Sequence, residues 1–235
     1  MKKGKRYQNN INLVDRSKRY ELDEAVELLK KTANAKFDET VELAVKLGVD
    51  PRKADQNIRG TVALPHGTGK EVRVIVFAQS DEQIQEAKEA GAIDAGGEEL
   101  VNKVSDGWLE FDVAVSTPDM MRFVGRLGRV IGPLGLMPSP KAGTVTNDIK
   151  DTVSEIMSGR IEYRVERTGS VVHVPVGKAS FEEEKIKENV STIMNILVSS
   201  RPPSAKGRYL RTIALSSTMG PGIKLDTSEF ARRRV

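Results

Sequence analysis

The pattern of apolar residues changes twice along this 235-residue chain, and this change constrains the fold more than any other feature. At 37–49, in FDETVELAVKLGV, apolar residues alternate as in a strand with one buried face. At 71–78, EVRVIVFA carries an uninterrupted apolar run, which is typical of a strand covered on both faces. Alternation returns after Gly159. The most economical interpretation is one domain made from both ends of the chain and a second domain inserted between them.

The middle of the chain alternates strands with helices. Strands are expected at 71–78 and 111–118, and helices at 81–92, 97–107, about 118–127 and 147–159. This order predicts a parallel sheet with helices on both sides. The inserted α/β domain is therefore assigned to 68–159.

The two ends of the chain predict an open α+β domain, assigned to 1–67 and 160–235. Its expected elements are helices at 20–33 and 181–200, strands at 37–49 and 57–65, a hairpin at 160–177 and a final strand pair at 206–225. The chain would cross between the domains near Gly67 or Gly69 and near Gly159, and two single-chain connections suggest a hinge as a hypothesis.

Positive charge is concentrated at the start of the chain. The net charge is +4, but within the first twenty residues seven basic side chains against Asp15 give a local charge of +6. Two interpretations stay open, a basic arm that touches a polyanion and a solvated terminus. The sequence contains no cysteine, no apolar run long enough to span a membrane and no secretory signal, so we expect a cytosolic protein.

No motif predicts an active site. PHGTGK at 65–70 lacks the first glycine and the final hydroxyl residue of a phosphate loop, since Leu64 and Glu71 occupy those places. His66 and His173 are isolated, so neither metal binding nor acid–base catalysis is predicted. We expect no enzyme activity, no metal and no cofactor.

The glycine-rich segment 125–145, GRLGRVIGPLGLMPSPKAGTV, carries only basic charged side chains. It has no G-x-G-x-x-G spacing and follows a predicted helix, so a nucleotide cradle is not expected. Main-chain N–H groups at the glycines, together with Arg126, Arg129 and Lys141, could bind the phosphates of a polynucleotide. A purely structural turn is the alternative.

Two other stretches offer groups that suit RNA. Phe37 stands just outside the alternating strand, where it could be a hydrophobic staple or a packing surface for RNA. SSTMGPG at 216–222 combines hydroxyls, a methionine and glycines, more than a bare turn requires.

Four motifs, KFDETVELAVKLGVDPRKADQNIRGTVALPHGTGK, GRVIGPLGLMPSPKAGTV, VGKASF and SSTMGPG, closely resemble the bacterial ribosomal protein L-one family, the protein of the mobile stalk. The resemblance covers essentially the whole chain. It implies a two-domain α/β fold in which a Rossmann-like domain is inserted into a discontinuous, split βαβ-like α+β domain.

The resemblance also implies a function. Such a protein binds large-subunit ribosomal RNA, helps release deacylated tRNA from the exit site and represses translation by binding its own operon messenger. It would be cytoplasmic, on the ribosome, and monomeric when free. The residues that match the family's main RNA surface, on the first domain, are Lys36, Phe37, Thr40, Arg164, Lys178, Ser180, Thr218, Met219 and Gly220. Auxiliary RNA contacts are expected from Arg126, Arg129 and Lys141.

This chain departs from the family in the glycine-rich segment. Leu134 stands where a basic residue is usual and Ser139 where asparagine is usual. The missing cation at Leu134 weakens the electrostatic case for this loop, and the flanking basic residues could compensate for it. Two other functions have less support in the sequence. A nucleotide-dependent enzyme on the middle domain lacks its fingerprint, and a protein-interaction module on helix 181–200 has only an ordinary amphipathic pattern.

Overall fold

The computed structural model describes residues 4–231, which form two compact units. Unit 1 combines Met1–Gly69 with Ile161–Val235, and unit 2 is Lys70–Arg160. The fold is thus mixed α/β, as the sequence predicts. Within the described part of the chain, no helix is long and apolar enough to cross a membrane.

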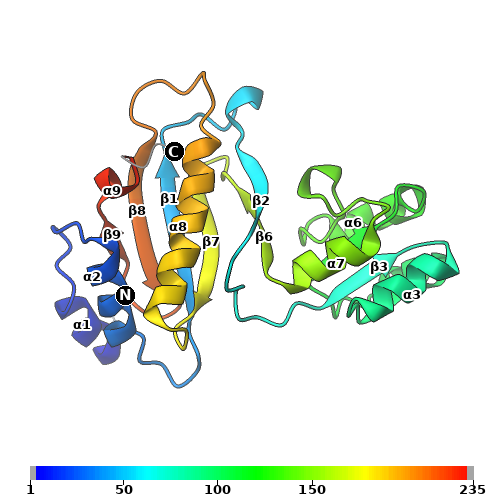
Figure 1. The fold of residues 1–235 in the computed structure, drawn as a ribbon, viewed down its shortest axis with the longest axis horizontal. Coiled ribbons are helices and arrows are strands. Elements are labelled where there is room, and N and C mark those ends of the chain that lie inside the picture. Colours follow the sequence, from blue (N-terminus) through cyan, green and yellow to red (C-terminus); the bar gives the residue numbers. More distant parts are fainter. Residues whose placement is uncertain (1–3, 232–235) are drawn as a thin grey trace. The chain divides into compact units, whose positions relative to one another are not determined.

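Unit 1 is built on a four-stranded antiparallel sheet with the order β7-β1-β8-β9 (Figure 1). The strands are β1 (Thr40–Leu47), β7 (Val171–Lys178), β8 (Leu210–Ser217) and β9 (Ile223–Leu225). In the central register, Leu43 lies opposite Val174 and Leu215. The predicted alternation of β1 is confirmed, because every second side chain from Val41 to Leu47 is buried.

Two long helices cover one face of this sheet (Figure 1). Helix α2 (Leu22–Thr32) contacts β8 and β9, while α8 (Glu183–Ser199) contacts β7. The short α9 (Thr227–Ala231) contacts α8 and β8. Leu29 and Ile193 are essentially inaccessible in the shared core, where each such side chain contributes about 1.5–3 kcal/mol relative to exposure. Burial of these apolar stripes fixes the helices on the sheet.

The expected hairpin at 160–177 is wrong in its pairing. β6 (Arg160–Arg164) pairs with β2 (Arg59–Ala63), and β7 pairs with β1. The two predicted arms of the hairpin are joined by one isolated antiparallel bridge, between Val165 and Val172. Alternation identifies strands but not their partners, so neighbours in sequence need not be neighbours in a sheet.

The basic start of the chain is partly ordered. Residues Lys5–Asn12 form helix α1, and the Asn10 side chain is buried. Its amide donates to the Thr32 carbonyl at 2.7 Å and to the Asn34 side chain at 3.2 Å. Asn10 thus ties α1 to the body of unit 1, although most of the helix is exposed, so both interpretations of the basic start stay open. Lys2 and Lys3 lie outside the described residues.

Unit 2 contains a three-stranded parallel sheet with the order β4-β3-β5, which confirms the predicted parallel pairing. The strands are β3 (Val74–Phe77), β4 (Asp94–Gly96) and β5 (Val113–Ser116). All four residues of β3 are buried, as its continuous apolar run predicts. Strand β4 was not predicted from the sequence, because Asp94–Gly96 has no apolar run to mark it.

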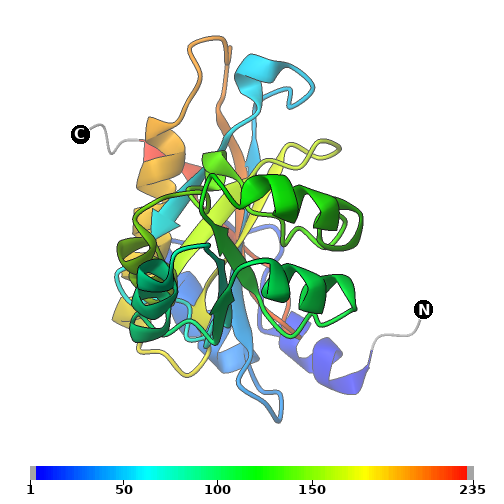
Figure 2. The ribbon, with the colours of Figure 1, turned by 90° about the vertical axis from the view of Figure 1, so that its right-hand side faces the viewer.

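Helices lie on both sides of this sheet (Figure 2). One core joins Val74 and Val76 to residues of α3 (Asp81–Glu89) and α7 (Ile149–Met157). The other joins Ile75 and Phe77 to residues of α4 (Glu98–Ser105) and of the helical turns that follow β5. Successive strand side chains point to opposite faces, so a continuous apolar strand serves two cores.

Candidate nucleic-acid interface

One end of the unit 1 sheet gathers three segments that are distant in sequence. The segment before β1, the turn after β7 and the turn after β8 meet there because Thr40 pairs with Lys178 and Val41 with Ser217. We call the predicted RNA-binding residues found there the strand-end patch: Lys36, Phe37, Thr40, Lys178, Ser180, Thr218, Met219 and Gly220. Antiparallel pairing, and not proximity along the chain, brings these residues together.

Thr40 is hydrogen-bonded from both sides. The Thr218 amide donates to the Thr40 carbonyl at 3.0 Å, and the Thr40 amide donates to Thr218 Oγ1 at 3.0 Å. The Thr218 hydroxyl also donates to the Thr40 carbonyl at 3.2 Å, and Lys178 Nζ donates to Thr40 Oγ1 at 3.0 Å. The Thr218 hydroxyl thus holds the patch together and retains one lone pair, since a hydroxyl oxygen can accept twice.

Asp38 fixes the turn after β7. The Ser180 hydroxyl donates to Asp38 Oδ2 at 2.7 Å, and the Ser180 amide donates to Asp38 Oδ1 at 3.1 Å. The Ala179 amide adds a bond to the Glu39 carbonyl at 2.8 Å. These three bonds tie the turn to the segment that carries Phe37.

Glu39 is the buried centre of the patch, with only 1% of its surface exposed. Its Oε2 accepts from the Ser217 hydroxyl at 2.8 Å and from the Met219 amide at 2.9 Å. Its Oε1 accepts from the Ala35 amide at 2.8 Å. Burial acts to raise the pKa of Glu39, but these hydrogen bonds and the charge of Arg6 outweigh burial and lower the pKa. The carboxylate therefore stays ionised and fixes two segments at once.

Two large apolar side chains project from this fixed framework. Phe37 is 54% exposed and Met219 is 47% exposed. Phe37 belongs to none of the apolar clusters within residues 4–231, so the staple interpretation is not supported. Exposed apolar groups on a rigid framework are available to pack on bases or sugars.

Gly220 occupies a place that no other residue can take without a shift. A Cβ atom at this position would overlap Ser217 Oγ, whose hydroxyl is bonded to Glu39. The Gly220 amide also donates to the Ser217 carbonyl at 3.1 Å. Gly220 therefore permits the tight turn that presents Met219.

Helix α1 lies at the same end of the sheet as the patch, where β1 begins and β8 ends (Figure 1). Arg6 lies close enough for its charge to act on Glu39. Exposed Lys36 and half-buried Lys178 carry further positive charge. This end of unit 1 combines cations with hydroxyls and amides, the groups that contact nucleic-acid backbones.

Arg164 is not part of the strand-end patch, which corrects the expectation that it lies nearby. It ends β6, and the next residue, Val165, bridges to Val172. Val172 is six residues from Lys178 along β7, about 20 Å at the rise of a β-strand. Arg164 is exposed near the opposite end of this strand.

The predicted glycine loop of unit 2 is partly helical. The preceding α5 (Met121–Val124) lies within the helix predicted at about 118–127. The segment itself begins with η2 (Gly125–Leu127) and α6 (Gly128–Ile131), and a further turn, η3, covers Pro140–Ala142. Val124, Leu127 and Ile131 are buried at helical spacing, a signal present in the sequence.

The basic residues of this segment are exposed on its turns, with Arg126 in η2 and Arg129 in α6. The guanidinium carbons of Arg122 and Arg126 lie 4.4 and 5.5 Å from the Phe123 ring centroid. Lys141 lies in η3, where Ser139 Oγ accepts its amide at 3.3 Å. We call Arg122, Phe123, Arg126 and Arg129 the basic face of unit 2.

Asp38 and Glu39 were not predicted as functional residues from the sequence. Both stand beside Phe37 in AKFDETVEL, and the only available signal was an acidic pair immediately before an alternating strand. Within residues 4–231, no group of three or more histidine or acidic side chains could hold a metal ion. His66 Nε2 instead lies 2.5 Å from Glu188 Oε2.

The model of the ribosomal protein L1p/L10e family matches residues 29–221 of this chain. The matched range includes all three segments of the strand-end patch.

Proposed function

The chain belongs to the ribosomal protein L1p/L10e family, and we propose that it forms the mobile stalk by binding one folded region of large-subunit RNA through the strand-end patch. Membership makes it a structural, RNA-binding protein of the large ribosomal subunit, in a family of ribosomal proteins and not of enzymes. The location on the ribosome follows from the same membership.

The observation that carries this proposal is the set of hydrogen bonds to buried Glu39. They order the segments that present Phe37 and Met219 before any RNA arrives. A preorganised surface loses less conformational entropy on binding, so more of the contact energy appears as affinity.

The chemistry of the patch suits a folded RNA. Lys178 uses one of its three N–H donors on Thr40, so the others can meet phosphate or 2′-OH oxygens. The exposed faces of Phe37 and Met219 can pack on sugars and unstacked bases. Hydroxyl and apolar contacts of this kind recognise RNA by shape.

The test uses a matched pair of exposed apolar residues, Met219 in the patch and Leu134 in unit 2, which is 55% exposed. Met219→Ala should weaken binding to large-subunit RNA by about 1–3 kcal/mol, and Leu134→Ala should leave it unchanged. Filter binding measures both affinities, and chemical footprinting locates the protected RNA. Equal affinities for the wild type and Met219→Ala would contradict the proposal that the strand-end patch binds this RNA.

We propose that the protein also helps release deacylated tRNA from the exit site, with Arg164 as one contact. Arg164 is exposed and lies about 20 Å from the patch, so an RNA bound there leaves it accessible. Arg164→Gln should weaken tRNA binding to ribosomes and leave ribosomal RNA binding intact. An unchanged rate of tRNA release in this variant would argue against the contact.

We further propose that the free protein is a cytoplasmic monomer that represses translation of its own operon through the same patch. A messenger that imitates the ribosomal site would compete for the same groups. Met219→Ala should therefore relieve repression of a reporter that carries the operon leader, in proportion to its loss of ribosomal RNA affinity. Full repression by this variant would separate the two activities.

A further inference from the structure

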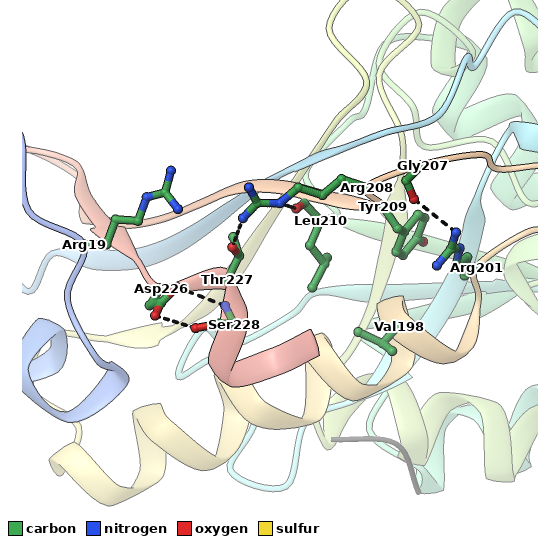
Figure 3. Close-up of a pocket in the computed structure, with 10 residues that line it drawn as sticks. All are labelled: Arg19, Val198, Arg201, Gly207, Arg208, Tyr209, Leu210, Asp226, Thr227 and Ser228. Carbon is green, nitrogen blue, oxygen red and sulfur yellow. Dashed lines mark hydrogen bonds between the residues drawn. The ribbon is translucent and has the colours of Figure 1, made fainter. Parts of the chain in front are cut away.

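A cavity of about 780 Å³ lies in unit 1, away from the strand-end patch (Figure 3). Gly207–Leu210 line it at the start of β8, whereas the patch follows the end of that eight-residue strand. The two sites are thus separated by about 25 Å at the rise of a β-strand. The cavity volume falls within the range of small-molecule sites, roughly 300–1,000 Å³.

Three arginines and one acidic residue line this cavity. The Arg208 guanidinium donates to the Leu210 carbonyl at 3.0 Å and also to the Thr227 hydroxyl. The Arg201 guanidinium donates to the carbonyls of Ala205 and Gly207, at 3.0 and 3.2 Å. These neutral acceptors fix both guanidinium groups without cancelling their charge.

The remaining charges leave the cavity positive. The Arg19 side chain forms no hydrogen bond or salt bridge within residues 4–231. Asp226 accepts the Ser228 amide at 3.0 Å and the Ser228 hydroxyl at 2.5 Å, and these bonds, helped by Arg19 and Arg208, lower the pKa of Asp226. Three cations against one carboxylate select an anion.

The two ends of the cavity differ in character (Figure 3). Arg19 and Arg208 stand toward one end, beside Asp226, while Val198, Tyr209 and Arg201 stand toward the other. The Arg201 guanidinium carbon lies 5.7 Å from the Tyr209 ring centroid. Planar rings can stack on flat guanidinium groups and pack on apolar walls, and guanidinium N–H groups donate hydrogen bonds to phosphate oxygens.

We infer that this cavity binds a nucleoside phosphate, with the phosphate at Arg19 and Arg208 and the base toward Val198 and Arg201. The same chemistry belongs to a free nucleotide and to the phosphorylated end of a single-stranded RNA. The inference is independent of the proposed binding of ribosomal RNA to the strand-end patch.

Calorimetric titration of the full chain tests this site, with AMP, adenosine and inorganic phosphate as probes. We expect saturable AMP binding, and at least about tenfold weaker binding of adenosine and of phosphate, because each lacks half of the contacts. Arg19→Gln should weaken AMP binding about tenfold, and the matched variant Arg16→Gln, outside the cavity lining, should not.

Short RNA strands with and without a 5′-phosphate distinguish the two sources. Tighter binding of the phosphorylated strand than of AMP, sensitive to Arg19→Gln, assigns the site to an RNA end, and the reverse order assigns it to a free nucleotide. Absence of saturable AMP binding, or equal losses in Arg19→Gln and Arg16→Gln, overturns the inference. Arg19→Gln should leave ribosomal RNA affinity unchanged, so failure here is separate from failure of the proposed function.

Discussion

The strand-end patch of unit 1 and the basic face of unit 2 are both candidate RNA surfaces, but they are built in opposite ways. The patch joins three segments from distant parts of the chain. The buried Glu39 carboxylate fixes two of them, and Asp38 fixes the third. The basic face comes from a single short segment, and two of its arginines, Arg122 and Arg126, lie over the ring of their neighbour Phe123.

This difference in construction predicts a difference in binding. A surface held by internal hydrogen bonds presents one shape, and shape recognises a particular folded RNA. Exposed arginines attract any phosphate backbone, with an affinity that falls as salt rises. Specificity should therefore reside in the patch and salt-dependent attraction in the basic face.

The largest effect is expected from Glu39→Gln. The amide replaces one acceptor oxygen with a donor, which would face the amide of Met219 or Ala35 or the Ser217 hydroxyl. Unit 1 should lose about 2–4 kcal/mol of stability, and ribosomal RNA affinity should fall as well. Denaturation followed by circular dichroism measures the first effect, and filter binding measures the second.

The control for Glu39→Gln is Glu42→Gln, whose carboxylate is 42% exposed and lies 3.4 Å from His173. It should change stability by less than about 0.5 kcal/mol, as is usual for surface substitutions. The native pKa of Glu39 lies below its ordinary value of 4.5, so its contribution is present above that value and is lost as pH falls through the lowered pKa. A Glu39→Gln protein as stable as the wild type at neutral pH would contradict the central role of this carboxylate.

Substitutions of Thr218 test the contribution of a single hydroxyl group in the strand-end patch. Thr218→Ala removes the hydroxyl that bonds both the amide and the carbonyl of Thr40, so binding to ribosomal RNA should weaken by about 1–3 kcal/mol. Thr218→Ser keeps the hydroxyl and should retain most of the affinity. Filter binding should show no loss for Thr212→Ala, which alters an exposed threonine on the same strand. Equal losses for the serine and alanine variants would show that the methyl group, and not the hydroxyl, matters.

A third prediction tests whether unit 2 can be weakened alone. Asp112 accepts Lys70 at 2.7 Å and Arg73 at 3.1 Å, and these bonds prevail over burial and lower its pKa to about 2. Asp112→Asn should cost about 1–2 kcal/mol at neutral pH, after allowance for exposed partners.

The depressed pKa of Asp112 also fixes the pH dependence. Its contribution is complete above the unfolded value of 3.8 and disappears as pH falls through about 2, so mutant and wild type should converge there. Trp108 is the only tryptophan and packs against the core of unit 2, so its fluorescence reports that unit. Convergence at higher pH would point to another carboxylate.

The smallest effect is expected from the double variant Arg126→Gln and Arg129→Gln. Affinity for ribosomal RNA should fall only a few-fold, and the slope of log affinity against log salt should flatten by about 1–2. Filter binding over a salt series measures the slope. A loss as large as that of Met219→Ala, with an unchanged slope, would contradict the division of labour between the two surfaces.

The sequence by itself determined the kinds of elements. Alternation identified β1, and the uninterrupted apolar run identified a strand covered on both faces, because side-chain periodicity records which faces are buried. It identified the motifs of the patch, and with them the family. It did not mark β4, since a three-residue strand without apolar side chains leaves no periodic signal.

The tertiary structure alone decided how these elements are connected. Strand pairing joined β6 to β2, separated Arg164 from the patch and placed Thr218 on Thr40, 178 positions away in the chain. It also gave Glu39 its role, which depends on one donor from its own segment and two from a distant one. The apolar pattern of a strand shows which of its two faces is buried. Hydrogen bonds between strands depend instead on which strand edges lie side by side, and only the folded chain determines that.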